Sequence, residues 1–365
     1  MLLRDLLPML HRLAPLELAE DWDNVGLLLG NLDQSVQRIM TCLTVTAATV
    51  AEACQENADL VISHHPLFYR PVKRITDQTE EGRLVLTLMR AGISVYSAHT
   101  AYDNAPGGIN DQIAGILELE SVQPLRPALA ERQCKIVVFV PESDLARVSD
   151  ALFAVGAGVI GQYRECSFRL PGTGTFFGTE QTRPTVGHKG RREEVVEWRL
   201  EVICPERLVD EAIRAMRAAH SYEEPAYDVY PLRPGYRPGG AGRIGRLPRE
   251  LTLQMLVEIV RQHWQQEAVR FVGEPEQIVR RVAVACGAGR DLLADAIRAG
   301  AQVVVTGELR FHDLLAAQAD GLNVVLLGHY GSERFAMENL ARRLAELLPE
   351  LTIWASHRER PVVRL

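Results

Sequence analysis

The first third of the chain alternates short apolar runs with segments of helical periodicity. Strand-length apolar runs occur at residues 38–45, 60–63 and 93–97. The segments around them repeat apolar positions every three to four residues. Helices are therefore expected at residues 2–13, 47–56 and 82–91. Continuous apolar strands that alternate with helices are typical of parallel βαβ units. The pattern predicts an α/β lobe over residues 1–127.

The pattern changes over residues 128–233. A strand at 135–140 and a helix at 143–155 precede a glycine-rich hairpin region around residues 172–178. A long alternating strand, a further helix and a last strand follow at residues 195–204, 205–219 and 226–232. The order β-α-β-β-α-β is the ferredoxin-like plan. We therefore expect an α+β domain here.

A stretch rich in proline and glycine follows, with PGYRPGG near its start. Such composition predicts a linker, over residues 233–248. Beyond it, strands are expected at 282–285, 303–305 and 324–327, and helices at 291–298 and 333–348. The simplest fold class is α/β: a split three-layer domain with parallel-rich sheets, residues 1–127 and 234–365, interrupted by the ferredoxin-like insert 128–233.

Composition and charge narrow the class of protein. Apolar residues make up 47% of the 365 and charged residues 24%, which is ordinary for a globular protein. A net charge of −7 with dispersed arginines argues against nucleic acid as a partner. The six cysteines are isolated, without a C-x-x-C pair, as in a reducing cytoplasm. Arg4 and Asp5 interrupt the N-terminal apolar run, so neither a signal peptide nor a membrane span is expected.

Four polar loops, each directly after an expected strand, carry groups that can bind metal ions. They contain the sequences ISHHPLFY, SAHTAYDN, TGELRFHD and LGHYGSE. Sites in open α/β sheets form beyond the carboxyl ends of the strands, so these loops are expected to converge. The candidate ligands are His64, His65, Asp103, His329 and Glu333. Nitrogen and oxygen donors without a thiolate suit zinc, manganese or iron.

The spacing of these residues favours two ions over one. His64 and His65 are adjacent at a strand end, and Pro66 prevents a helix from continuing through them. Adjacent side chains diverge, so each imidazole can serve a different ion. His329 is expected in a loop and Glu333 in the first helical turn, where a carboxylate is favoured and could bridge two cations. Two ions about 3.5–4 Å apart activate water and bind a carbonyl or phosphoryl oxygen.

Each motif alone also has a structural explanation. A lone His-His pair more often lies exposed on the surface or caps a helix. Only the convergence of all four loops favours a metal site. His99 is open between ligation and support of a ligand. Helix capping or a hydrogen bond to a ligand is as good an explanation as ligation for Glu308, His312 and Asp313. Residues 21–24 are most simply a turn with an Asx cap, and the alternative is that they border the site.

These motifs, with EDWDNVGLLLG near the start, resemble the dinuclear metal-centre family known as GTP cyclohydrolase 1 type 2 homologues. CSFRLPGTGTFFGTE and HSYEEPAYDVYPL are similar to the PII/CutA-like insert of its long bacterial form. The resemblance implies two divalent ions per subunit, held by the five candidate ligands with Glu333 bridging. It also implies a homohexameric toroid, such as a trimer of dimers, with the inserts trimerising over its openings. Thr44 and Glu308 stand where the family commonly has aspartate.

Two functions remain open. The first is a metal-dependent hydrolase of a nucleotide-like or small polar substrate, and the family name suggests opening of the purine ring of GTP. The chain has no Walker-type loop, and no residue is singled out as catalytic. The second is a non-enzymatic metal- or ligand-sensing assembly, because PII-like folds commonly bind effectors at subunit clefts. The loop 164–179 and the turn 220–224 are the candidate contacts for such an effector.

Overall fold

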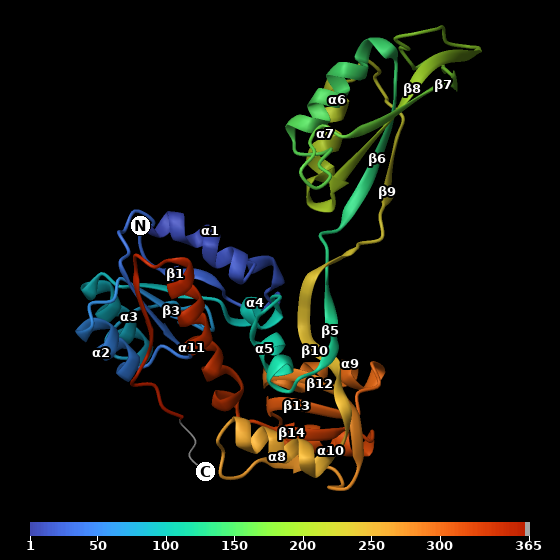
Figure 1. Cartoon of the computed structure of the whole chain (residues 1–365). Coiled ribbons are helices and arrows are strands. Elements are labelled where there is room, and N and C mark those ends of the chain that lie inside the picture. Colours follow the sequence, from blue (N-terminus) through green and yellow to red (C-terminus); the bar gives the residue numbers. More distant parts are fainter. Residues whose placement is uncertain (362–365) are drawn as a thin grey trace. The chain divides into compact units, whose positions relative to one another are not determined.

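The computed structural model describes residues 1–361 and contains two compact units (Figure 1). The first combines Met1–Ala128 with the chain from Arg237 onward, and the second is Leu129–Tyr236. The structure is mixed α/β with parallel-rich sheets, as the sequence pattern predicts. Among the described residues, no helix is both long enough and apolar enough to span a bilayer.

The first unit contains a five-stranded sheet, ordered β1-β4-β3-β2-β15. Its strands are β1 (Gly26–Leu29), β2 (Arg38–Cys42), β3 (Leu60–Ser63), β4 (Ser94–Ser97) and β15 (Thr352–Ala355). All neighbours run parallel except β1, which is antiparallel to β4. The crossover helices are α2 (Ala47–Gln55) and α3 (Glu80–Ala91). Every residue of β3 and β4 is buried, which explains their continuous apolar sequence.

A six-stranded sheet, ordered β11-β14-β13-β12-β10-β5, completes this unit. Its strands are β5 (Glu120–Leu129), β10 (Tyr236–Thr252), β11 (Arg270–Val272), β12 (Ile278–Ala288), β13 (Val303–Glu308) and β14 (Asn323–Leu326). Strands β12, β13 and β14 are parallel to one another. Strand β10 pairs antiparallel with β12, and β11 pairs antiparallel with β14. The helices of this part are α8 (Leu253–His263), α9 (Leu293–Arg298) and α10 (Phe311–Ala319).

One hydrophobic core joins the two sheets. Helices α1 (Leu3–Leu13), α4 (His99–Asn104), α5 (Ile109–Ile116) and α11 (His329–Leu347) contribute to it. The core contains Ile62 and Tyr96 from the first sheet and Val305 from the second, all at most 1% exposed. Helix α11 packs against strands of both sheets, so its first turn is held between them.

A buried arginine adds a polar link within this unit. Arg243 of β10 is 2% exposed, and its guanidinium donates to the Asp111 carboxylate at 2.5 and 2.9 Å. The same group donates to the carbonyl oxygens of Gly240, Gly242 and Ala105 at 2.7–3.0 Å. A buried charge with this many partners does not carry the penalty of an unpaired ion.

The second unit is a four-stranded antiparallel sheet with two helices. Its elements are β6 (Gln133–Val140), α6 (Leu145–Ala154), β7 (Ser167–Phe177), β8 (Arg192–Pro205), α7 (Val209–Ala219) and β9 (Tyr227–Pro231). The strand order β7-β8-β6-β9, with every pair antiparallel, follows the ferredoxin-like plan. Ile136, Leu152, Leu200 and Met216 are fully buried between sheet and helices.

The stretch expected as a linker at residues 233–248 contains the division between the two units, after Tyr236. The linker itself is wrong for most of this stretch, which belongs to β10. Residues 239–245 are all buried. A Cβ atom on Gly240, whose φ is +142°, would lie 2.3 Å from the carbonyl oxygen of Arg126. On Gly242, with φ at +60°, it would lie 2.8 Å from that of Val284. The glycines therefore permit close backbone approach within a sheet, where composition alone indicates flexibility.

The backbone around Gly240 provides a test of this packing. We expect Gly240→Ala to lower the free energy of unfolding by roughly 1–3 kcal/mol, because alanine tolerates neither the φ nor the contact with Arg126. Gly235→Ala is the control, since open space surrounds its added Cβ, and it should change stability by less than about 0.5 kcal/mol. Equal losses of stability for Gly240→Ala and Gly235→Ala in chemical denaturation would contradict the close backbone packing at Gly240.

Candidate metal centre

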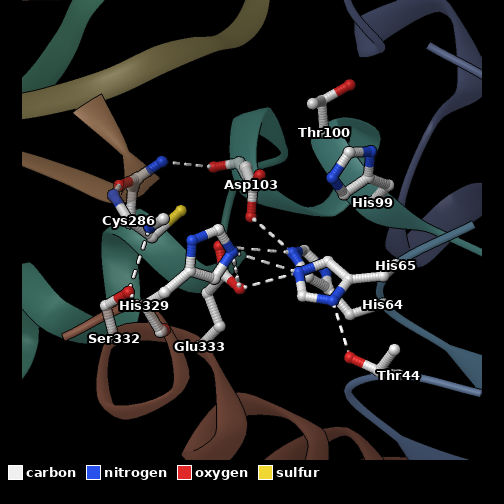
Figure 2. Close-up of polar contacts among 12 residues, drawn as sticks. Thr44, His64, His65, His99, Thr100, Asp103, Cys286, His329, Ser332 and Glu333 are labelled. Carbon is white, nitrogen blue, oxygen red and sulfur yellow. Dashed lines mark hydrogen bonds and ion pairs between the residues drawn. The ribbon is translucent and has the colours of Figure 1, made fainter. Parts of the chain in front are cut away.

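The polar loops of both sheets meet at one place in the first unit. His64 and His65 follow β3, Asp103 lies in α4 after β4, and His329 and Glu333 lie in the first turns of α11 after β14. Their side chains point toward one another in Figure 2. The structure thus brings together the five residues on which the sequence analysis converges.

A first group of donor atoms surrounds His64. Its Nε2 lies 3.6 Å from Oδ1 of Asp103 and 3.7 Å from Oε1 of Glu333. His64 is fully buried, and Glu333 is 3% exposed. These separations exceed hydrogen-bonding distance but are short enough for one cation to contact all three atoms.

A second group shares Glu333 through its other oxygen. Oε2 lies 3.1 Å from Nε2 of His65 and 3.2 Å from Nε2 of His329, and the two nitrogens are 3.3 Å apart. These three residues form a cluster whose donor atoms all lie within 4.8 Å of one another. The carboxylate of Glu333 therefore faces one imidazole with one oxygen and two with the other.

Local backbone geometry sets the position of Glu333. Gly328, with φ at +76°, precedes the helix, so α11 begins at His329. The sequence analysis places His329 in a loop and starts the helix at residue 333, which is wrong. His329 and Glu333 then share one face of the helix, one turn apart. A Cβ on Gly287 would lie 2.3 Å from Oε1 of Glu333, so only glycine leaves room for this carboxylate.

Several buried polar atoms of the cluster lack hydrogen-bond partners. Within residues 1–361 these include both ring nitrogens of His64 and Oδ1 of Asp103. Leaving a buried polar group unsatisfied costs about 1–3 kcal/mol. A cation among these atoms would satisfy Nε2 of His64 and Oδ1 of Asp103, so the residues fit a metal ion.

The ionisation of one buried carboxyl group of the cluster affects the pKa of the other. Burial raises the pKa of Asp103, and the charge of Glu333 adds to this effect. Burial would also raise the pKa of Glu333, but His64, His329 and His65 outweigh it and hold that pKa well below its usual value. Burial lowers the pKa of His64, but the charges of Asp103 and Glu333 reverse the shift. Additional positive charge here would let both carboxyl groups ionise.

The remaining ring nitrogen of two of these histidines is held by a neighbour. Nδ1 of His65 lies 2.8 Å from Oγ1 of Thr44, and Nδ1 of His329 lies 3.1 Å from Oε1 of Glu308. Such contacts fix the orientation of an imidazole and leave Nε2 directed at the cluster. Glu308, which the sequence analysis leaves open, thus contacts His329.

His99 has a carboxylate partner, Asp23, in the segment that the sequence analysis takes as a capped turn or as a border of the site. Oδ1 of Asp23 lies 2.7 Å from Nδ1 of His99, and Oδ2 accepts from the backbone and hydroxyl of Thr100. Burial opposes ionisation of Asp23, but the hydrogen bond with His99 outweighs it and lowers the pKa. A tertiary contact across 76 residues leaves no mark in a local motif.

Other candidates lie differently. His312 is exposed and packs edge-on against Phe311, so the structure does not bring it to the cluster. Asp313 pairs with Arg290 at 3.1 Å and accepts from the backbone of Arg310. Cys286 lies near the C-terminal end of β12 and lines the site, although it belongs to none of the sequence motifs. Burial raises the pKa of its thiol well above the usual value.

The cluster opens into a cleft of about 980 Å³. His65, Asp103, His329 and Glu333 form part of its wall, whereas His64 lies beneath the surface. The remaining wall comes from loops of both sheets: Trp22, Pro66, Tyr69, His99, Thr100, Cys286, Gly287, Ala288, Arg290, Asp291, Glu308, Leu309, Arg310 and Asp313. A cleft of this size accommodates a small-molecule ligand.

The fold and the cluster define a mixed α/β protein with a histidine–carboxylate site that could hold metal ions. The chain belongs to the Duf34/NIF3 (NGG1p interacting factor 3) family, whose model matches residues 1–361. The family predicted from the sequence motifs is therefore confirmed, whereas the PII/CutA-like character of the insert stays a prediction.

Relatives and solved structures agree with this assignment. A "GTP cyclohydrolase 1 type 2 homolog" of Halalkalibacterium halodurans is 38% identical over 93% of this chain and 91% of the relative. The Bacillus subtilis protein of the same name is 36% identical over 94% and 92%. A Bacillus cereus protein related to NIF3 matches with 36% identity, a TM-score of 0.69 and coverage of 100% and 99%. Staphylococcus aureus protein SA1388 matches with 26% identity, a TM-score of 0.80 and the same coverage.

The effect of the neighbouring carboxylates on the pKa of His329 can be tested by titration of the metal-free protein. The hydrogen bond with Glu333, reinforced by Glu308, raises the pKa of His329 to about 9. Protonated His329 therefore stabilises the folded metal-free chain below pH 6.5, and this contribution is lost as the pH rises toward 9. We expect Glu308→Gln to lower the pKa of His329, measured by NMR of its ring. Asp313→Asn is the control, and an unchanged pKa in Glu308→Gln would refute the coupling.

Proposed function

We propose that the cluster binds two divalent metal ions, with Glu333 bridging them. His64, Asp103 and Oε1 of Glu333 would hold one ion. His65, His329 and Oε2 of Glu333 would hold the other. The observation that carries this proposal is the set of buried donors without partners, both ring nitrogens of His64 and Oδ1 of Asp103, beside a carboxylate that faces three imidazoles.

The donor set narrows the metal. Imidazole and carboxylate donors suit zinc, manganese and iron, and metal availability decides among them. Burial keeps the Cys286 thiol protonated, because it raises the pKa. The proposed set therefore contains nitrogen and oxygen without a thiolate.

The proposed activity is hydrolysis of a nucleotide-like or small polar substrate in the cleft of about 980 Å³. A pair of bound divalent ions supplies Lewis acidity and activated water for such a reaction. Thr44 and Glu308 orient the imidazoles of His65 and His329. Asp23 holds Nδ1 of His99, which fixes the orientation of this imidazole at the cleft wall. The relatives' name makes GTP the first substrate to test.

Metal content tests the ligand assignment directly. We expect Glu333→Ala to lose most of its bound metal, because one carboxylate serves both proposed ions. His312→Ala is the matched control, since His312 is exposed and away from the cluster. The measurement is elemental analysis of both purified variants beside the wild type. Equal losses would make the ranking wrong and would make His312 a ligand.

Activity tests the reaction. Wild-type protein reconstituted with zinc, manganese or iron is incubated with GTP, and formate release is measured. We expect release from the wild type and His312→Ala but not from Glu333→Ala. No formate with any of the three metals would remove the GTP reaction and leave phosphoesters and other nucleotides as candidates for the same site.

A non-enzymatic sensing role is the second candidate. The second unit has its own cavity of about 660 Å³, lined by β7, β8 and the turn that includes Tyr222 and Glu223. We propose residues 128–233 as a separate regulatory domain in this alternative. A metabolite that raises the melting temperature of the full chain without being consumed would favour sensing, and turnover of a nucleotide would favour catalysis.

We also propose that the chain forms a cytoplasmic homohexamer. Phe168 and Leu170 of β7 and Val196 of β8 are between 44% and 72% exposed, and large exposed apolar side chains favour association. All six cysteines lie in the described part of the chain and are free thiols, as in a reducing compartment. Light scattering should give six times the 40.6 kDa chain mass.

A further inference from the structure

An aromatic pair lines the cleft of the candidate metal centre without being part of any core. Trp22 and Tyr69 are 56% and 61% exposed, and their ring centroids lie 6.0 Å apart. Trp22 also packs edge-on against His99, with centroids 5.9 Å apart. Hydrophobic burial does not explain two large rings that stay more than half exposed. Exposed aromatic faces in a ligand cleft are suited to stacking on a planar ring.

Loops of the second sheet place two arginines in the wall of the same cleft, beside the carboxylates of Asp291, Glu308 and Asp313. Arg290 follows β12 and is paired with Asp313 at 3.1 Å. Arg310 follows β13 and is exposed, and within residues 1–361 no carboxylate forms an ion pair with it. An arginine without a carboxylate partner is available for a bidentate contact with phosphate or carboxylate.

We propose that this cleft binds a planar heteroaromatic ring that carries an anionic group, as in a nucleoside phosphate. Trp22 and Tyr69 contact the ring, and Arg310 contacts the anion. This assignment of substrate class rests on the proposed function for the chemistry at the ions, but the binding residues are separate from the five metal ligands. The cleft volume of about 980 Å³ is sufficient for a nucleotide.

Three probes separate the parts of this ligand: guanosine monophosphate, guanosine without the phosphate, and ribose 5-phosphate without the ring. Affinity is measured by calorimetry on the full chain, with and without bound metal. Trp22 is the exposed member of the chain's four tryptophans, and the other three are partly buried. We expect guanosine monophosphate and guanosine to quench tryptophan fluorescence and ribose 5-phosphate to leave it unchanged.

Variants assign each contact. Trp22→Leu and Tyr69→Leu should each weaken binding of guanosine monophosphate about tenfold, the size expected for loss of one stacking partner. Arg310→Gln should weaken guanosine monophosphate to a similar degree and leave guanosine unchanged. Matched controls are Tyr163→Leu, which removes an aromatic ring that is 76% exposed in the other unit, and Arg298→Gln on α9. Both controls should bind like the wild type.

The outcomes distinguish this inference from the metal proposal. Wild-type affinity in both aromatic variants, equal affinity for ribose 5-phosphate and guanosine monophosphate, or no binding of any probe would overturn the ring site. Elemental analysis is run on the same samples. Bound metal with a failed ring site leaves the metal centre standing. Ring binding that depends on Trp22, in protein that retains no metal after incubation with zinc, manganese or iron, leaves the ring site standing and removes the metal centre.

Discussion

The structure of the site depends on one buried carboxylate. Glu333 is 3% exposed and faces His64, His65 and His329 at 3.1–3.7 Å, with Asp103 beside the same His64 nitrogen. Removing charges from water is costly unless compensating charge lies nearby. The imidazoles supply part of that compensation and lower the pKa of Glu333, whereas the pKa of Asp103 remains raised. This unequal pair is the physical basis for expecting cations here.

The surrounding chain is shaped to hold that carboxylate. Gly287 leaves room for it, and the start of α11 at His329 sets its direction. A further network reaches the opposite side of the cluster. The Glu359 carboxylate forms an ion pair with Arg334 and accepts from the backbone of Leu43 and Thr44. Thr44 in turn contacts His65. The neutral hydroxyl of Thr44 orients the ring without adding negative charge, and burial lowers the pKa of His65.

The proposed ring binding and the proposed metal chemistry use different parts of the same cleft. The proposed ions lie among ligands on strand ends and helix starts, which are rigid elements that keep donor atoms in place. The proposed ring contacts, Trp22 and Tyr69, lie outside regular elements, where larger side chains can be exposed without disturbing the core. The second unit has its own core and its own cavity. A chain organised in this way can change its ligand without rebuilding the cluster.

Local pattern was sufficient for much of this protein. Continuous apolar runs predict the buried parallel strands β3, β4 and β13 because both of their faces are covered, and the polar loops after them predict a metal-competent site. Tertiary contacts decided the rest. The glycines of β10 resemble a linker until neighbouring backbones are seen to approach them, and Asp23 is an ordinary turn residue until His99 lies 2.7 Å away. Periodicity records which face of an element is buried. It does not record which distant residue covers that face, because that pairing exists only once the chain has folded.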